Sequence, residues 1–170
     1  MFCYLRKKEK IYLESCVKFT TSDNLFDQRL QDLYAKYLSK EKDNSLVCVD
    51  HCVSEYILEY FMFYNKPWFE VDHILFPIHI VKQKHWVLVH LSFKDRCLYV
   101  YDSMRGATHD RGVLEILDCY NILLPLFLDV VDFGSKRTDL DVTSGPYASK
   151  KLTDPFSVCW VDNLPSQETK

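Results

Sequence analysis

The sequence predicts a single α+β domain, and three observations indicate that class. A strong helical pattern lies in the N-terminal third, a hairpin of two apolar strands lies at the centre, and helices and strands do not alternate regularly as strand–helix–strand units. The chain has 170 residues, of which 48% are hydrophobic and 26% charged. That length and composition are typical of one globular domain with its own core, so we treat residues 1–170 as a single domain.

Composition also excludes several classes of protein. A net charge of -3 gives no electrostatic reason to expect nucleic acid or an anionic membrane as a partner. No apolar run reaches the roughly 18 residues that a membrane span needs. The 7 cysteines form no CxxC pair, and the N-terminus does not resemble a secretory signal, which together favour free thiols in a reducing compartment. We therefore expect an intracellular monomer, in the nucleus or cytoplasm, without a cofactor.

The clearest predicted helix covers residues 24–38. Ser22 or Asp23 can cap its N-terminus, and apolar residues recur at helical spacing along one face. A second helix is predicted over 50–62. The residues expected to face the core from these two helices are Phe26, Leu30, Leu33, Tyr37, Val53, Tyr56, Ile57 and Tyr60.

The C-terminal half continues the mixed pattern. A third helix is predicted over 109–124 within an amphipathic run to residue 130, and Pro125 is expected to kink or split that run. Residues 134–153 are polar and lack periodicity, so they predict a loop. Strands are predicted near residues 71–78, 85–93, 97–103 and 156–162, all within one sheet.

The central hairpin, "KHWVLVHLSFKDRCLYVYDS" at residues 84–103, ends in two polar side chains. If Lys94 and Asp95 form the turn, Asp102 lies diagonal to His85 on the same face, roughly 7–8 Å away between backbones and within side-chain reach. A carboxylate there would orient the imidazole as a general base requires. The alternative is a polar cap, in which the two side chains only satisfy each other.

This region resembles the catalytic domain of the ubiquitin-like-protease family, the SUMO-specific cysteine peptidases, and is most similar to its divergent plant branch. An aromatic-rich "KPWFEVDHILFPIHI" is followed by "HWVL" and then "YVYDS", in the order of the family signature. The segments "KFTTSDNLFDQRLQDLY" and "DPFSVCWVDNLPSQ" extend the likeness to nearly the whole chain. The resemblance implies a papain-like fold and cleavage after the Gly-Gly tail of a SUMO-type modifier or its conjugates.

The resemblance also implies roles for four residues. His85 matches the general base, and Asp102 matches the residue that orients it. Trp86 matches the tryptophan that helps line the narrow tunnel for the Gly-Gly tail. Gln167 matches the glutamine whose amide contributes to the oxyanion hole.

The nucleophile of the family is absent from this pattern. In the family, Asp-Cys-Gly follows the glutamine by several residues, whereas this chain ends at Lys170. Met1 falls inside what should be the first helix. We therefore expect a domain truncated at its N-terminal edge and before its nucleophile cysteine, and inactive on its own.

No other cysteine of the sequence offers an evident substitute, and no metal site is predicted. Buried thiols without a helix N-terminus beside them are usually inert. "CVDHC" offers Cys48, His51 and Cys52, which is a weak zinc pattern without a partner cluster. Spacing assigns no role to the remaining histidines, His73, His79, His90 and His109. Two classes of function therefore stay open. The first is a Gly-Gly-specific cysteine peptidase or its inactive fragment, and the second is a non-catalytic module that binds a ubiquitin-like protein, or a decayed transposon-borne pseudo-peptidase.

Overall fold

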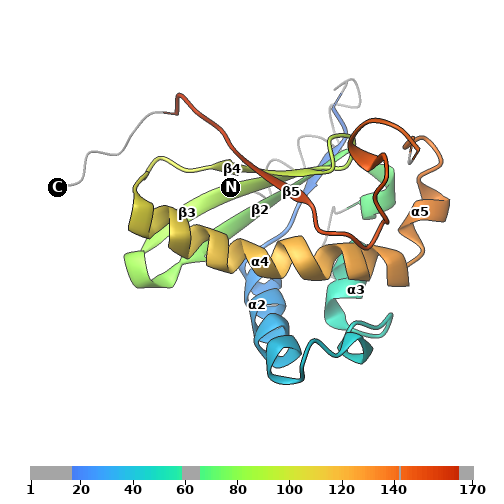
Figure 1. Ribbon diagram of the computed structural model, residues 1–170, viewed down its shortest axis with the longest axis horizontal. Helices are drawn as coiled ribbons and strands as arrows, with labels where there is room; N and C mark the ends of the chain where they lie inside the picture. The colour runs from blue at the N-terminus through green and yellow to red at the C-terminus, as the bar shows by residue number, and fades with distance from the viewer. Residues whose placement is uncertain (1–16, 59–65, 142, 165–170) are drawn as a thin grey trace.

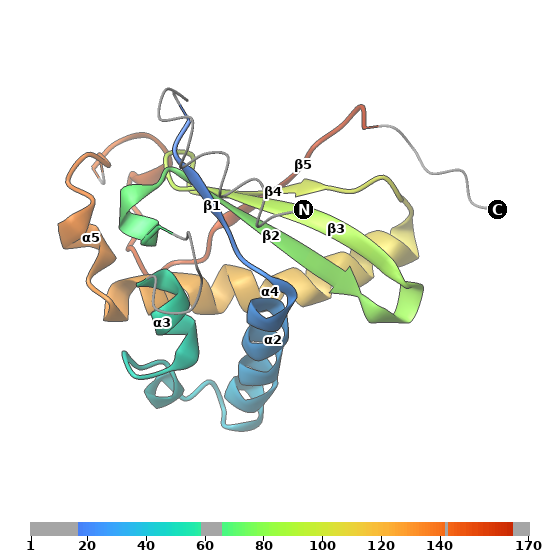
Figure 2. The same cartoon turned by 180° about the vertical axis from the view of Figure 1, so that it is seen from behind.

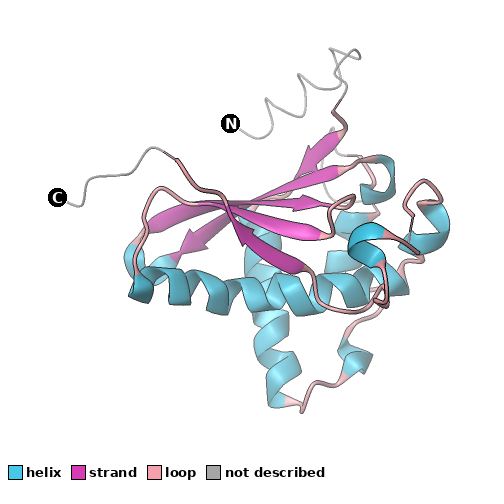
Figure 3. Cartoon of the chain, turned by 45° about the horizontal axis from the view of Figure 1, so that its top comes forward, coloured by secondary structure: helices cyan, strands magenta, loops and turns pink. Residues whose placement is uncertain are grey.

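The computed structural model describes residues 17–58, 66–141 and 143–164. A mixed sheet lies at its centre (Figure 3). Its strand order is β1-β2-β3-β4-β5. Its strands are β1 (Phe19–Thr21), β2 (His73–Ile80), β3 (His85–Ser92), β4 (Cys97–Tyr101) and β5 (Ser157–Trp160). The β2–β3 and β3–β4 pairs are antiparallel, whereas β1 and β5 add parallel edges to β2 and β4.

Three helices cover the same side of this sheet, as both Figure 1 and Figure 2 show. They are α2 (Asn24–Ser39), α3 (Cys52–Ile57) and α4 (Ala107–Val130), and the short α5 (Phe133–Lys136) follows α4. Single 3-10 turns lie at Asn44–Leu46, Trp68–Glu70, Val81–Gln83 and Gly145–Tyr147. The predicted α+β class is confirmed.

The core lies between the sheet and the helices. Alternate residues of β2 and β3 are buried, as expected for strands with one covered face. Phe26 of α2 contacts the rings of Tyr56, Trp68, Phe76 and Tyr120, with centroids 5.1 to 6.3 Å apart. Among the described residues, no helix combines the length and the apolar character that crossing a membrane requires.

Helix α2 begins where its capping residue predicts. Asp23 has an extended backbone, and its side chain accepts a hydrogen bond from the backbone N–H of Phe26 at 2.9 Å. The core-facing residues predicted for residues 24–38 and 50–62 are all buried where they are described; Tyr60 lies outside the described residues.

Neither proline in the predicted strand and helix ends its element. The first predicted strand, near residues 71–78, is β2, which begins at His73 and continues past Pro77 to Ile80. Because the backbone N–H of Ser22 donates to the Leu75 carbonyl, Leu75 and Pro77 both face β1, and β1 pairs no further than Leu75. The missing N–H of Pro77 therefore removes no ladder hydrogen bond.

Pro125 does not split the long C-terminal helix. It lies inside α4, which begins at Ala107, two residues before the predicted start, and runs to Val130. A proline removes one helical hydrogen bond, and its burial in the core offsets part of that loss.

The remaining boundaries differ at the ends. Helix α3 begins at Cys52 rather than residue 50. The predicted loop over 134–153 contains most of α5 and one 3-10 turn. Strand β1 was not predicted, because three residues carry too little pattern to show a strand. The first helix expected near Met1 lies outside the described residues.

Candidate active site

Strand β3 places His85 at the end of an apolar row. Lys84, in the left-handed conformation with φ 49, closes the turn after β2, and His85 is the first residue of β3. The next residues on its face, Val87 and Val89, are buried, and His85 itself is only 8% exposed. The imidazole is therefore held at the edge of the core with little contact with water.

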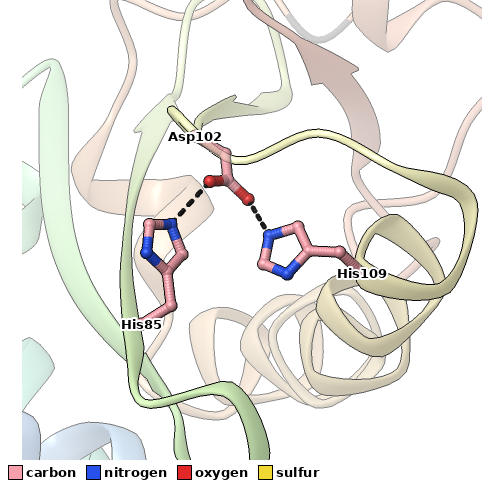
Figure 4. A group of neighbouring side chains, drawn as sticks. All are labelled: His85, Asp102 and His109. Atoms are coloured by element: carbon pink, nitrogen blue, oxygen red, sulfur yellow. Dashed lines mark hydrogen bonds and ion pairs between the residues drawn. The ribbon is translucent and has the colours of Figure 1, made fainter. Parts of the chain in front are cut away.

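Asp102 reaches the same place from β4. The β3–β4 register pairs Leu88 with Tyr101 and Ser92 with Cys97, as the predicted turn at Lys94 and Asp95 requires. Asp102 follows β4 directly, and its side chain is fully shielded from solvent. One carboxylate oxygen, Oδ1, lies 2.7 Å from Nε2 of His85 (Figure 4). The contact that the hairpin pattern predicts is present.

The backbone beyond β4 fixes the carboxylate. The N–H of Met104 donates to Oδ1 of Asp102 at 2.9 Å, which closes a local turn around the aspartate. Oδ1 therefore faces both the Met104 amide and the His85 ring. Rotation of the carboxylate would break both contacts together.

A second histidine, His109, contacts the other carboxylate oxygen. Its Nε2 lies 2.5 Å from Oδ2 of Asp102, so that the aspartate stands between two imidazoles (Figure 4). The opposite ring nitrogen, Nδ1, contacts the side-chain oxygen of Gln83, in the turn between β2 and β3. His109 belongs to the first turn of α4 and is buried.

Sequence reasoning missed His109. Its contact depends on the path of the chain between β4 and α4, which strand or helix periodicity does not encode. The available signal was its position seven residues after Asp102 at the start of a helix, and that spacing alone is not diagnostic.

These contacts leave one nitrogen of His85 available. Asp102 is an acceptor, so the proton of His85 resides on Nε2 in the neutral ring, and the lone pair resides on Nδ1. Within the part of the chain that the structure describes, no side chain hydrogen-bonds this Nδ1. The arrangement can therefore take a proton from a group that approaches Nδ1, while the carboxylate stabilises the charged ring that results.

The two other predicted site residues are differently placed. Trp86, adjacent to His85 on β3, is 53% exposed and stacks on His79 of β2 with ring centroids 4.6 Å apart. Its indole is thus open to a ligand and supported from behind. Gln167 lies outside the described residues.

None of the described cysteines is placed as a nucleophile. Burial raises the pKa of the Cys97 thiol to about 12 and holds that of Cys119 well above its usual value. Both therefore remain thiols at neutral pH. Over residues 17–58, 66–141 and 143–164, no cysteine hydrogen-bonds His85. The described cysteines are Cys48, Cys52, Cys97, Cys119 and Cys159.

A metal site can be tested against the same geometry. The ligand atoms of His85, Asp102 and His109 lie within 4.8 Å of one another, and their chemistry suits zinc. Each imidazole nitrogen concerned already hydrogen-bonds the carboxylate, so a cation would have to displace both protons.

The weak zinc pattern "CVDHC" has a structural role at His51. Nδ1 of His51 accepts a hydrogen bond from the backbone N–H of Val53 at 3.2 Å and caps α3.

Comparison with known proteins agrees with this architecture. The sequence model described as the Ulp1 protease family, C-terminal catalytic domain, matches residues 18–167. No curated protein matches the chain. The matched range contains His85, Trp86, Asp102, His109 and Gln167.

Proposed function

The chain belongs to the Ulp1 protease family, a family of cysteine peptidases, and has its papain-like α+β fold; from this premise we propose a specific mechanism and substrate. His85 is the general base, and Asp102 is the carboxylate that orients it. The observation that carries the proposal is the 2.7 Å contact between them, which leaves Nδ1 of His85 available to a nucleophile. The substrate is the Gly-Gly tail of a SUMO-type modifier or of its conjugates.

The proposed reaction uses this geometry in two steps. His85 takes the proton of a cysteine thiol at Nδ1, and the thiolate attacks the carbonyl carbon of the terminal glycine. The protonated ring then gives that proton to the departing amine, and a thioester remains on the enzyme. The same ring then takes a proton from water, whose oxygen attacks the thioester carbonyl. The C–S bond breaks, the carboxylate of the modifier is released, and the ring returns the proton to the cysteine sulfur.

Two further residues supply specificity and charge stabilisation in the proposal. The side-chain amide of Gln167 donates to the oxyanion, a contact worth about 3–4 kcal/mol of barrier. Trp86 forms one wall of the passage for the tail. The proposal is supported by its exposed indole, stacked on His79, because an aromatic wall close to the chain accepts glycine and excludes larger side chains.

The 170-residue chain is proposed to be inactive alone. General-base catalysis requires the nucleophile within about 3 Å of the base, and no described cysteine has that position. Oxyanion stabilisation and binding without the nucleophile retain a rate of roughly 10³–10⁴-fold over uncatalysed hydrolysis, which is invisible for a peptide bond.

The test compares this chain with a form extended by a family-type Asp-Cys-Gly segment and its following helices. Both are incubated with a SUMO–fluorophore substrate and then with a SUMO vinyl sulfone that traps a reactive cysteine. The proposal expects turnover and labelling of the added cysteine in the extended form only. Turnover by the shorter chain, or labelling of Cys97, Cys119 or Cys159, would mean that the nucleophile has been misplaced. Tight SUMO binding without turnover by either form would instead favour the non-catalytic module.

A further inference from the structure

We propose that His109 is a positioning residue: it holds the second oxygen of Asp102 and thereby fixes the proton of His85 on Nε2. The inference rests on the proposed function, since it concerns the base of the same site. It departs from a simple histidine–aspartate pair, because the carboxylate stands between two imidazoles.

The first step of the argument is the burial of the carboxylate. The Asp102 side chain has no exposed surface, so water does not solvate either oxygen. Oδ1 has two donors, the ring of His85 and the amide of Met104, whereas His109 is the one donor that Oδ2 has among the described residues. Removing that donor would leave a buried anionic oxygen without a hydrogen bond, which is strongly unfavourable for a charged group.

The second step concerns the proton between His109 and Asp102. A carboxylate oxygen only accepts, so an Nε2 lone pair of His109 at 2.5 Å would repel it, and Nε2 must carry hydrogen. The amide of Gln83 can present either its oxygen or its NH2 group to Nδ1 of His109. Nε2–H of His109 therefore points at Asp102 whichever group of Gln83 it meets.

The third step links His109 to His85. An unsatisfied Oδ2 would be relieved by rotation of the carboxylate toward another donor, and this rotation displaces Oδ1 from His85. The ring of His85 would then be free to exchange its proton between Nε2 and Nδ1. A proton on Nδ1 blocks the nitrogen that the proposed reaction needs.

The experiment measures the imidazole protons directly, with neither substrate nor nucleophile, so its outcome is independent of whether the chain cleaves anything. The 170-residue protein is labelled with ¹⁵N-histidine, treated with chelator to exclude metal, and examined by two-bond ¹H–¹⁵N correlation. This spectrum distinguishes a protonated from an unprotonated ring nitrogen. His85→Ala and His109→Leu identify the two residues by loss of their signals.

The expected wild-type result is a protonated Nε2 on both His85 and His109, each with a downfield hydrogen-bonded proton, and both hydrogen-bonded signals are lost in Asp102→Leu, which offers no acceptor. In His109→Leu the Nε2–H signal of His85 is lost or gives way to a mixture of tautomers. His109→Gln, whose amide reaches Oδ2 with an N–H donor, retains it. The control is His90→Leu, because His90 points to the opposite face of β3, where it contacts His73; it leaves the His85 signal unchanged.

An unchanged His85 signal in His109→Leu would overturn the inference, as would a folded His109→Gln in which that signal is lost. If His109→Leu does not fold, the wild-type spectrum decides. An unprotonated Nε2 on His109 contradicts the inference, and a hydrogen-bonded Nε2–H that disappears in Asp102→Leu supports it.

Discussion

Asp27 is a carboxyl group in the core, where α2 meets α4, and it differs from Asp102 in its partners. Its Oδ1 accepts hydrogen bonds from the Tyr120 hydroxyl at 2.8 Å and from the Gln31 amide at 2.9 Å, both neutral donors. Burial raises the pKa of Asp27 above its usual 3.8, because desolvation outweighs these hydrogen bonds. The folded state therefore binds a proton at Asp27 more tightly than the unfolded chain does.

The consequence is a measurable pH dependence of stability. Because the pKa of Asp27 is raised in the folded state, the group contributes to the free energy of unfolding. This contribution is fully present below pH 3.8 and is lost as the pH rises through the folded-state pKa. Asp27→Asn keeps an oxygen for both donors and removes the titration, so the variant should gain stability relative to wild type as the pH rises across that window. Urea unfolding of both proteins from acid to neutral pH measures the difference. A difference that does not vary with pH would show that Asp27 is solvated normally.

The sequence predicts the position of some residues of the site but not of others. His85 and Asp102 could be placed together because strand alternation and a two-residue turn determine which side chains share a face. His109 could not, since its contact with Asp102 depends on three-dimensional chain direction after β4. The position of Gln83, in an irregular turn, is equally invisible to periodicity.

Helix α4 carries His109 in its first turn, so the start of this helix positions one side chain of the site. Its start is capped by Asp110, whose Oδ1 accepts the backbone N–H of Gly106 at 3.2 Å, and not by the N-cap residue itself, which is a glycine. Arg105 pairs with Asp110 and also covers the ring of Trp160 at 4.2 Å. These contacts connect the first turn of α4 with β5.

Gly112 lies inside α4, where glycine lowers helix stability. A Cβ added there would meet only the side-chain nitrogen of Gln83 at 3.7 Å, an ordinary contact. Gly112→Ala should therefore raise the free energy of unfolding by about 0.5–1 kcal/mol, measured by urea denaturation.

Gly134 in α5 is the matched control for that substitution. A Cβ there would lie 2.7 Å from Cδ1 of Leu152, so the leucine must move. Gly134→Ala should gain less than Gly112→Ala or lose stability. A larger gain at Gly134 than at Gly112 would contradict this account of the two helices.

Strands and helices were predictable to the extent that each had a repeating apolar face. The helix over 24–38 had both a cap and a face, and it was placed within one residue of its observed bounds. Sequence rules could not show how either proline is accommodated. Pro77 is tolerated because β1 ends before it, and Pro125 is buried in the core. The effect of a proline depends on which neighbour its missing N–H would have met.

On the scale of the whole molecule, Arg96 ties the central hairpin to the C-terminal segment. It is 1% exposed, and its guanidinium donates to the backbone carbonyls of Pro155 at 2.7 Å, Asp154 at 2.5 Å and Lys151 at 3.1 Å. The rings of Tyr147 and Phe156 flank it, at 5.7 and 5.5 Å from the centroids. One buried cation thus organises the loop that leads into β5.

Arg96→Leu should destabilise the protein strongly. The change removes charged hydrogen bonds of about 1.5–3 kcal/mol each and leaves buried carbonyls without donors, so we expect a loss of at least about 3 kcal/mol in urea unfolding. Arg96→Lys should restore little of this, because a single ammonium cannot reach three carbonyls in the fork that a guanidinium spans. Trypsin should cleave at Lys150 and Lys151 faster in both variants. Wild-type cleavage rates in Arg96→Leu would show that the loop is held by other contacts.

If His85 is the base of a cysteine peptidase, its loss must lower the rate far more than the loss of a histidine on the opposite face of the same strand. In the form extended by a nucleophile segment, kcat/KM for the SUMO–fluorophore substrate is measured for His85→Ala and for His90→Ala, two histidines on opposite faces of β3. The account predicts a loss of about 10²–10⁴-fold for His85→Ala and a value close to that of the unsubstituted protein for His90→Ala. Equal values for the two variants would contradict it.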